Sequence, residues 1–185
     1  MLKAGFSLIE MLLAIILTSI LMIVIMVFYP KMQMDSLIFY QQYRLEESVN
    51  QVLSGLIKDI KRAGFIANQL TNLTKSPIVI SNDKQCIMIR YDLYRRGEWR
   101  EDKYNKSDSD IFVYRYYQKN IVYRLGIPNC NGQDWERLFD SNEIEVTRFK
   151  ILLYSHFVAI DLSVRLKSNN FITYSTTHYV KTENI

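Results

Sequence analysis

The chain is poor in the residues that most enzymes and metal sites use. Its 185 residues include only two histidines, His156 and His178, and two cysteines. No zinc-ligand spacing, nucleophile elbow or phosphate-binding loop occurs, and no two carboxylates have a spacing typical of acid–base catalysis. Both histidines are expected in strands, where a single histidine usually serves packing. We therefore expect no enzymatic activity, no catalytic or metal-binding residue, no cofactor and no small-molecule substrate.

Charge is absent from one long stretch. From Met11 to Tyr29, nineteen residues carry no charge, and all are hydrophobic except Thr18, Ser19 and the Tyr29 hydroxyl. As a helix with a rise of about 1.5 Å per residue, this run would cover roughly 28 Å, which is close to the hydrocarbon thickness of a bilayer. The sequence therefore predicts one membrane helix.

A cleavable secretory signal is the alternative interpretation of this stretch, because Lys3 supplies a positive start. However, the apolar run is longer than the core of a signal peptide, and no small-x-small pattern follows it before Pro30. The positive-inside rule does not orient the segment, since Lys3 on one side faces Lys31 and Arg44 on the other.

The rest of the chain is mildly basic and contains both cysteines. The net charge is +4, and almost all of it follows the apolar run, which is compatible with acidic partners without indicating nucleic acid. A disulfide between Cys86 and Cys130 would fit an oxidising compartment such as a periplasm, whereas two unrelated thiols would fit a cytosol. The bridge would close a loop of about 45 residues, worth roughly 4 kcal/mol in the chain-entropy model.

A helical pattern resumes after Pro30. Apolar residues recur at spacings of three and four, which places them on one face of a helix: Leu45, Val49, Val52, Leu53, Leu56, Ile57 and Ile60. Basic residues and then Gly64 mark its end. We expect one long helix from Phe6 to about Ala63, bent near Pro30, whose second half is the spine of a globular head.

The remaining residues have the pattern of strands. Seven segments are rich in β-branched and aromatic residues: Ile78–Ile80, Cys86–Leu93, Ile111–Tyr117, Ile121–Leu125, Glu145–Tyr154, Phe157–Leu166 and Phe171–Val180. Polar turns are expected between some of them, at Gln118–Asn120 and Lys167–Asn170. These segments predict an antiparallel sheet packed on the helix, which is an α+β fold. The polar stretch Arg95–Asp110 is expected to be the most mobile loop.

Glu10 lies at the edge of the apolar run. A carboxylate deep in lipid costs at least about 2.5 kcal/mol and usually marks function. Taken alone, Glu10 could equally lie at the headgroup boundary and end the span.

The sequence around Glu10, GFSLIE, resembles the processing site of type IV prepilins and type II secretion pseudopilins. The resemblance rests on leader length, the Gly-Phe junction, the Glu spacing and the membrane helix that follows. It implies a leader at residues 1–5, cleavage after Gly5 by a prepilin peptidase, and Phe6 as a methylated N-terminus. It also implies that Glu10 pairs with the amine of a neighbouring subunit during assembly.

Two further segments resemble minor pilins of the prepilin peptidase-dependent protein B type. They are RLEESVNQVLSGLIKDIKRAGF, at residues 44–65, and NCNGQDWERLFDSNEIEVTRF, at residues 129–149, where a Cys and a Trp precede a strand. J-type pseudopilins and W-type minor pilins share a similar pattern. The resemblance implies a type IV pilin-like fold with a transmembrane and filament-core half at 6–30, an amphipathic half at 31–64 and a β-rich head at 65–185.

The function implied is that of a minor pilin, which helps to prime and assemble a type IV pilus. Its partners would be prepilin peptidase, other minor and major pilins and inner-membrane lipid, with the head in the periplasm. A minor pseudopilin of type II secretion and a DNA- or surface-binding minor pilin of a competence pilus remain alternatives.

Two ligand-binding interpretations were open. Basic residues are interleaved with aromatic residues in part of the chain; they are Arg95, Arg96, Arg100, Arg115, Lys119 and Arg124, with Tyr94, Trp99, Tyr114, Tyr116, Tyr117 and Tyr123. Such a pattern could contact DNA, although the same alternation also describes a half-buried strand. Asp102, Asp108 and Asp110 are too few for a calcium cage, which needs six or more oxygen ligands.

Overall fold

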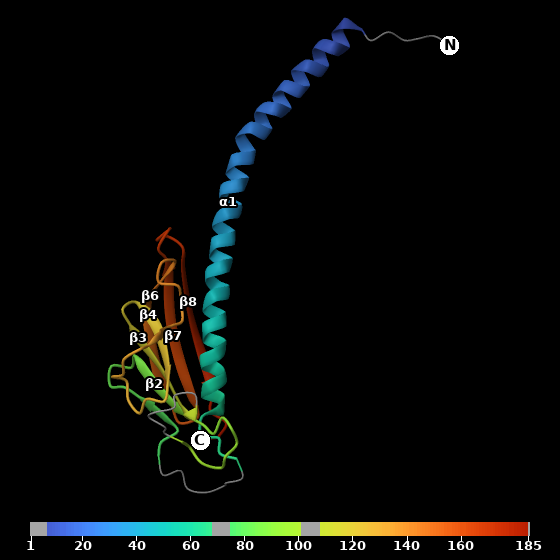
Figure 1. Cartoon of the computed structure of the whole chain (residues 1–185). Helices are drawn as coiled ribbons and strands as arrows, with labels where there is room; N and C mark the ends of the chain where they lie inside the picture. The colour runs from blue at the N-terminus through green and yellow to red at the C-terminus, as the bar shows by residue number, and fades with distance from the viewer. Residues whose placement is uncertain (1–6, 68–74, 101–107, 185) are drawn as a thin grey trace. The chain divides into compact units, whose positions relative to one another are not determined.

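A computed structural model describes residues 7–67, 75–100 and 108–184. Within these ranges the chain forms one helix and eight strands (Figure 1): α1 (Leu8–Arg62), β1 (Ile78–Ile80), β2 (Cys86–Arg90), β3 (Ile111–Tyr117), β4 (Asn120–Leu125), β5 (Glu136–Arg137), β6 (Ile144–Leu153), β7 (Phe157–Leu166) and β8 (Thr173–Lys181). The chain divides into two units, Met1–Gln41 and Gln42–Ile185, and the division falls within α1.

Helix α1 is 55 residues long and has Pro30 inside it. It ends one residue before the expected Ala63, and the chain then turns at Gly64, whose φ of 87° is a conformation that glycine adopts without strain. The Gly64 N–H donates to the Arg90 carbonyl at 2.9 Å, so the helix end is tied to β2. The bend near Pro30 stays a prediction, and the expected start at Phe6 lies outside the described residues.

The α+β class is confirmed, but the strands form two sheets where one was expected. Strands β1 to β5 make a five-stranded sheet in sequence order, and β6 to β8 make a three-stranded sheet. Every pairing is antiparallel. Strand β5 was not expected, because two residues are too few to show a period. His178 lies in β8, whereas the expectation of a strand at His156 is wrong: the chain reverses there, and Tyr154 N–H donates to the Phe157 carbonyl.

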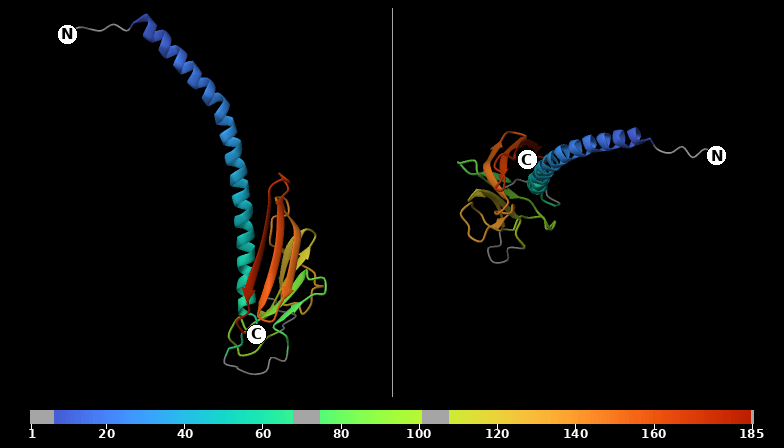
Figure 2. Two further views of the ribbon diagram at one scale, coloured as in Figure 1. Left: turned by 180° about the vertical axis from the view of Figure 1, so that it is seen from behind. Right: turned by 90° about the horizontal axis from the view of Figure 1, so that it is seen from above.

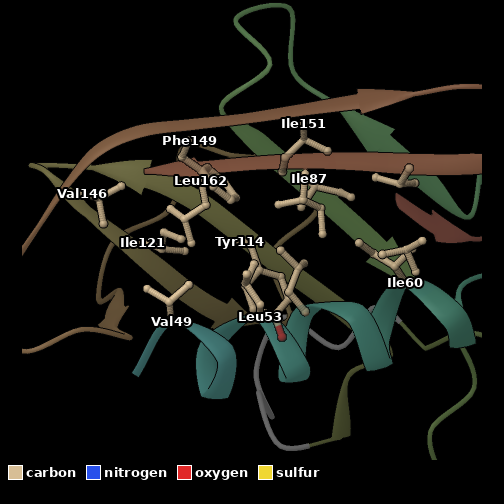
Figure 3. Packing of buried hydrophobic residues seen from close by; sticks show 14 of the residues in the cluster. Val49, Leu53, Ile60, Ile87, Tyr114, Ile121, Val146, Phe149, Ile151 and Leu162 are labelled. Carbon is tan, nitrogen blue, oxygen red and sulfur yellow. The ribbon is translucent and has the colours of Figure 1, made fainter. Parts of the chain in front are cut away.

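The core of the head lies between the second half of α1 and the sheets (Figure 3). Leu45, Val49, Leu53, Leu56 and Ile60 are at most 1% exposed. In Figure 3, Val49, Leu53 and Ile60 face side chains from both sheets: Ile87, Tyr114, Ile121, Val146, Phe149, Ile151 and Leu162. Because each fully buried aliphatic side chain contributes about 1.5–3 kcal/mol, this stripe holds the helix and the two sheets together.

Strand β8 runs beside the second half of α1, as both Figure 1 and Figure 2 show. At one end the Tyr174 hydroxyl donates to the Glu46 carboxylate at 3.5 Å, and beyond the other end the Asn184 amide donates to the Lys61 carbonyl at 3.3 Å. Two hydrogen bonds, one near each end of β8, therefore connect the edge of the three-stranded sheet to this part of the helix.

Replacing Leu53 tests whether this stripe stabilises the head. We expect Leu53→Ala to lower the free energy of unfolding by about 2–5 kcal/mol, because the cavity it leaves cannot close fully. Thermal unfolding of the full chain in detergent measures the effect. The control is Ser54→Ala on the exposed side of the same turn, expected within about 0.5 kcal/mol of wild type. Equal effects of the two changes would contradict this packing.

Candidate functional site

Glu10 bonds to the first turn of its own helix. The Ser7 N–H donates to the Glu10 carboxylate at 3.0 Å, while the Ser7 carbonyl accepts from the N–H groups of Glu10 and Met11 at 3.0 and 3.3 Å. A glutamate three residues after a serine is one half of a capping box, which satisfies an N–H that the helix leaves unpaired. Gly5 and Phe6, the residues of the expected processing site, lie outside the described residues.

The helix after Glu10 exposes apolar side chains on all sides. Its large hydrophobic residues from Leu8 to Tyr29 are between 46% and 80% exposed. The two hydroxyls in this stretch bond within the helix: Thr18 donates to the Ala14 carbonyl at 2.9 Å, and Ser19 donates to the Ile16 carbonyl at 2.8 Å. By length and composition α1 is able to cross a membrane. Its apolar surface suits lipid or other apolar helices and is unfavourable in water.

A disulfide crosses the outer face of the five-stranded sheet. It joins Cys86 of β2 to Cys130, whose Cα atoms are 6.3 Å apart. A small second core surrounds it, formed by Met88, Ile111 and Val113 with Trp135 partly buried against them. The segment after β4 is thereby fixed over the sheet, on the side away from α1.

The polar loop after β2 is organised around Arg96. Its guanidinium pairs with the Asp108 carboxylate and, at 2.8 Å, with Asp110, which is fully buried. Asp110 also accepts hydrogen bonds from the N–H groups of Leu93 and Arg100, each at 2.9 Å. These bonds fix the described ends of the loop expected to be mobile. Two of the three aspartates considered for calcium hold an arginine instead, and Asp102 lies outside the described residues.

Three more of the basic residues considered for DNA have partners within the chain. Arg115 donates to the Cys130 carbonyl at 2.7 Å, Lys119 pairs with Glu145 at 2.8 Å, and Arg124 lies 3.8 Å from Asp134. The interleaved Tyr114 is 5% exposed and faces the core. The alternation of Tyr and Arg therefore describes half-buried strands.

A buried carboxylate under these strands was missed by the sequence reasoning. Asp59 of α1 is 8% exposed and accepts hydrogen bonds from the hydroxyls of Tyr91, at 2.9 Å, and Tyr114, at 2.6 Å. Burial raises the pKa of the Asp59 carboxyl, although the two tyrosines and the nearby Arg62 and Lys58 act in the opposite direction. Asp59 interrupts the apolar stripe at a helix position next to Ile60, and that is the only trace of the network in the sequence.

The pH dependence of stability tests this network. Because the pKa of Asp59 is raised on folding, its ionisation opposes folding above the folded-state pKa, and this penalty disappears below the unfolded value of about 3.9. We therefore expect the stability of wild type relative to Asp59→Asn to rise as the pH falls from 7 towards 4. Thermal unfolding in detergent at several pH values measures it.

A comparison with Asp59→Ala separates the charge from the hydrogen bonds. Alanine leaves the hydroxyls of Tyr91 and Tyr114 without their acceptor, which costs about 1–3 kcal/mol for each. If the difference in unfolding free energy between wild type and Asp59→Asn does not change with pH, or if wild type gains stability relative to Asp59→Asn as the pH rises, the raised pKa of Asp59 is contradicted.

These features define a class of protein. A long apolar N-terminal helix, continuous with the helix that carries antiparallel sheets in an α+β head, is the arrangement of type IV pilin-like proteins.

Comparisons with known proteins identify the family within this class. Residues 39–182 match the family model of prepilin peptidase-dependent protein B, and the chain belongs to this family. It is 24% identical over 150 residues to prepilin peptidase-dependent protein B of Escherichia coli (strain K12), which covers 81% of this chain and 78% of that protein. No solved structure matches the chain significantly. The family match begins at residue 39, so Gly5, Phe6 and Glu10 lie outside it.

Proposed function

We propose that this chain is a minor pilin, a non-enzymatic subunit that helps to prime and assemble a type IV pilus. The observation that carries the proposal is the exposed apolar surface of α1, which begins beside a single carboxylate at Glu10. Membership of the prepilin peptidase-dependent protein B family supports it, because that name relates the family to prepilin processing. In this proposal the same surface is covered by lipid before assembly and by other subunits afterwards.

The proposed precursor crosses the inner membrane once, with its head in the periplasm. The disulfide between Cys86 and Cys130 supports this orientation, since disulfides persist in oxidising compartments. Prepilin peptidase removes residues 1–5, and Phe6 becomes the methylated N-terminus. Residues 6–30 are then the membrane and filament-core segment, residues 31–64 the amphipathic segment, and residues 65–185 the head.

Glu10 is proposed to guide assembly through its charge. Within the described part of the chain the Glu10 carboxylate accepts the Ser7 N–H, and on assembly this hydrogen bond would be exchanged for an ion pair with the amine of a neighbouring Phe6. An unpaired charge inside an apolar bundle is costly, and pairing it removes much of that cost. Two neighbouring helices would therefore be most stable in the one axial register that places the Phe6 amine of one subunit against the Glu10 carboxylate of the other.

A minor pseudopilin of type II secretion would use the same helix and the same pairing. The two functions differ in the filament that the chain joins, so loss of pili or loss of protein export on deletion of the chain separates them. DNA binding is not proposed, because Arg96, Arg115, Lys119 and Arg124 all have partners within the chain.

Replacing Glu10 tests the assembly role. We expect Glu10→Ala to insert into the membrane at normal levels but to associate with other subunits roughly 100-fold more weakly, since breaking a buried ion pair costs about 3 kcal/mol or more. Pilus number should fall with it. Co-isolation of the subunits and counting of pili by electron microscopy are the measurements.

Two controls sharpen this test. Glu10→Gln keeps an acceptor for the Ser7 N–H but removes the charge, so it should behave like Glu10→Ala if charge pairing is the cause. Glu47→Ala removes an exposed carboxylate from the head part of α1 and should leave pili unchanged. Normal piliation with Glu10→Ala present at wild-type levels would refute the role given to Glu10.

A further inference from the structure

An open groove of about 460 Å³ lies within the head, beside the core stripe of α1. One wall is a side of the helix formed by Ser48, the adjacent pair Gln51 and Val52, and Gly55; the pair lies three or four residues from each of the other two. The other walls come from β3 to β6 and the turn between β5 and β6: Tyr114, Tyr123, Glu136, Leu138, Phe139, Asp140, Glu143 and Ile144. The groove is thus a surface feature of the head.

Gly55 leaves the helix backbone bare in this groove. It lies well inside α1, where glycine weakens a helix relative to alanine. A Cβ atom added at this position would meet nothing within 4 Å, and its φ is not in the left-handed region. Neither packing nor backbone conformation within the described chain requires a glycine here. A bare backbone does, however, allow another molecule to approach the helix closely.

The rim of the groove is acidic. Glu136, Asp140 and Glu143 line it, and none of its described lining residues is a lysine or arginine. Glu143 faces Arg44 at 3.4 Å with both side chains about half exposed, whereas Glu136 and Asp140 have no ion pair within the described ranges.

The apolar side chains that line the groove are less exposed than the acidic ones. They are Val52, Leu138 and Ile144, together with the ring of Tyr123. Apolar surface beside exposed carboxylates matches a lysine or arginine side chain, which packs its aliphatic stem on apolar surface while its charged end stays near water and carboxylates.

We propose that this groove receives a lysine or arginine carried by a segment of a different pilin-like subunit of the filament, not a second copy of this chain, and that the backbone of this segment approaches α1 at Gly55. The inference rests on the proposed function in one respect, that the neighbour is a subunit of the same filament. The acidic rim selects the partner by charge, and the bare backbone at Gly55 sets how closely the segment can approach. This contact lies in the head and is independent of the pairing of Glu10.

Photo-crosslinking of the full chain in cell membranes tests the proposal. A benzophenone side chain placed at Gln51, which is exposed on the groove wall, should form an adduct whose cross-linked peptide, identified by mass spectrometry, belongs to another pilin-like subunit and contains a lysine or arginine. An adduct with a second copy of this chain, with lipid only, or no adduct at all would overturn the proposal.

Variants of the groove test its two elements separately. Gly55→Leu should place a side chain where the partner's backbone would approach α1. Glu136→Lys combined with Asp140→Lys should reverse the charge of the rim. Each should lower the yield of the adduct at least tenfold. The matched controls are Asn50→Leu, on an exposed part of α1 outside the groove, and Glu183→Lys, on an exposed part of the head; both should leave the yield unchanged. Reversing the charge of the cross-linked basic residue should restore the adduct with the lysine variant.

The outcomes separate this inference from the proposed function. Formation of the disulfide and resistance to protease report that each variant is folded, and the charge variants change only exposed residues. If pili require the chain but folded groove variants keep the adduct at full yield, the groove inference fails alone. If deletion of the chain leaves pilus number unchanged, the proposed function fails, whatever the groove binds.

Discussion

The apolar surface of the first half of α1 is the constraint on which everything else depends. Side chains from Leu8 to Tyr29 stay about half exposed or more on every side of the helix, and water is an unfavourable surrounding for so much apolar area. Lipid or other apolar helices suit this surface. In the proposed function, membrane storage and filament packing are two ways of covering it, and Glu10 is proposed to be the charged group that finds a partner when it is covered.

The second half of the same helix meets its requirement within the chain. Its apolar residues lie on one stripe, and both sheets cover that stripe, so that Leu45, Val49, Leu53, Leu56 and Ile60 are buried. The disulfide fixes the segment after β4 on the opposite side of the five-stranded sheet. The side of the helix next to the stripe is left open at Gly55, and there the head offers a specific surface to another protein.

How much of this could be predicted from the sequence depends on the range of the interactions. The extent of α1, its stop at Gly64 and most strand positions follow from periods of four residues or fewer and from local turn residues. The N-terminal motif is equally local. Other features depend on contacts between residues that are distant in the sequence, and the division into two sheets is one of them. The pairing of Arg96 with Asp108 and Asp110 and the bonds from Tyr91 and Tyr114 to Asp59 join residues that are 12 to 55 positions apart. No period marks such contacts, which is why the alternating tyrosines and arginines also fitted a DNA-binding surface.

The most direct test of the account is the mass and N-terminal sequence of the chain isolated from membranes of cells with and without prepilin peptidase. The account predicts that the chain begins at Phe6, with a methylated amine, when the peptidase is present, and retains residues 1–5 when it is absent. A chain that still begins with Met1 in cells with active peptidase would contradict it, because no amine at Phe6 would then exist to meet Glu10 of a neighbouring subunit.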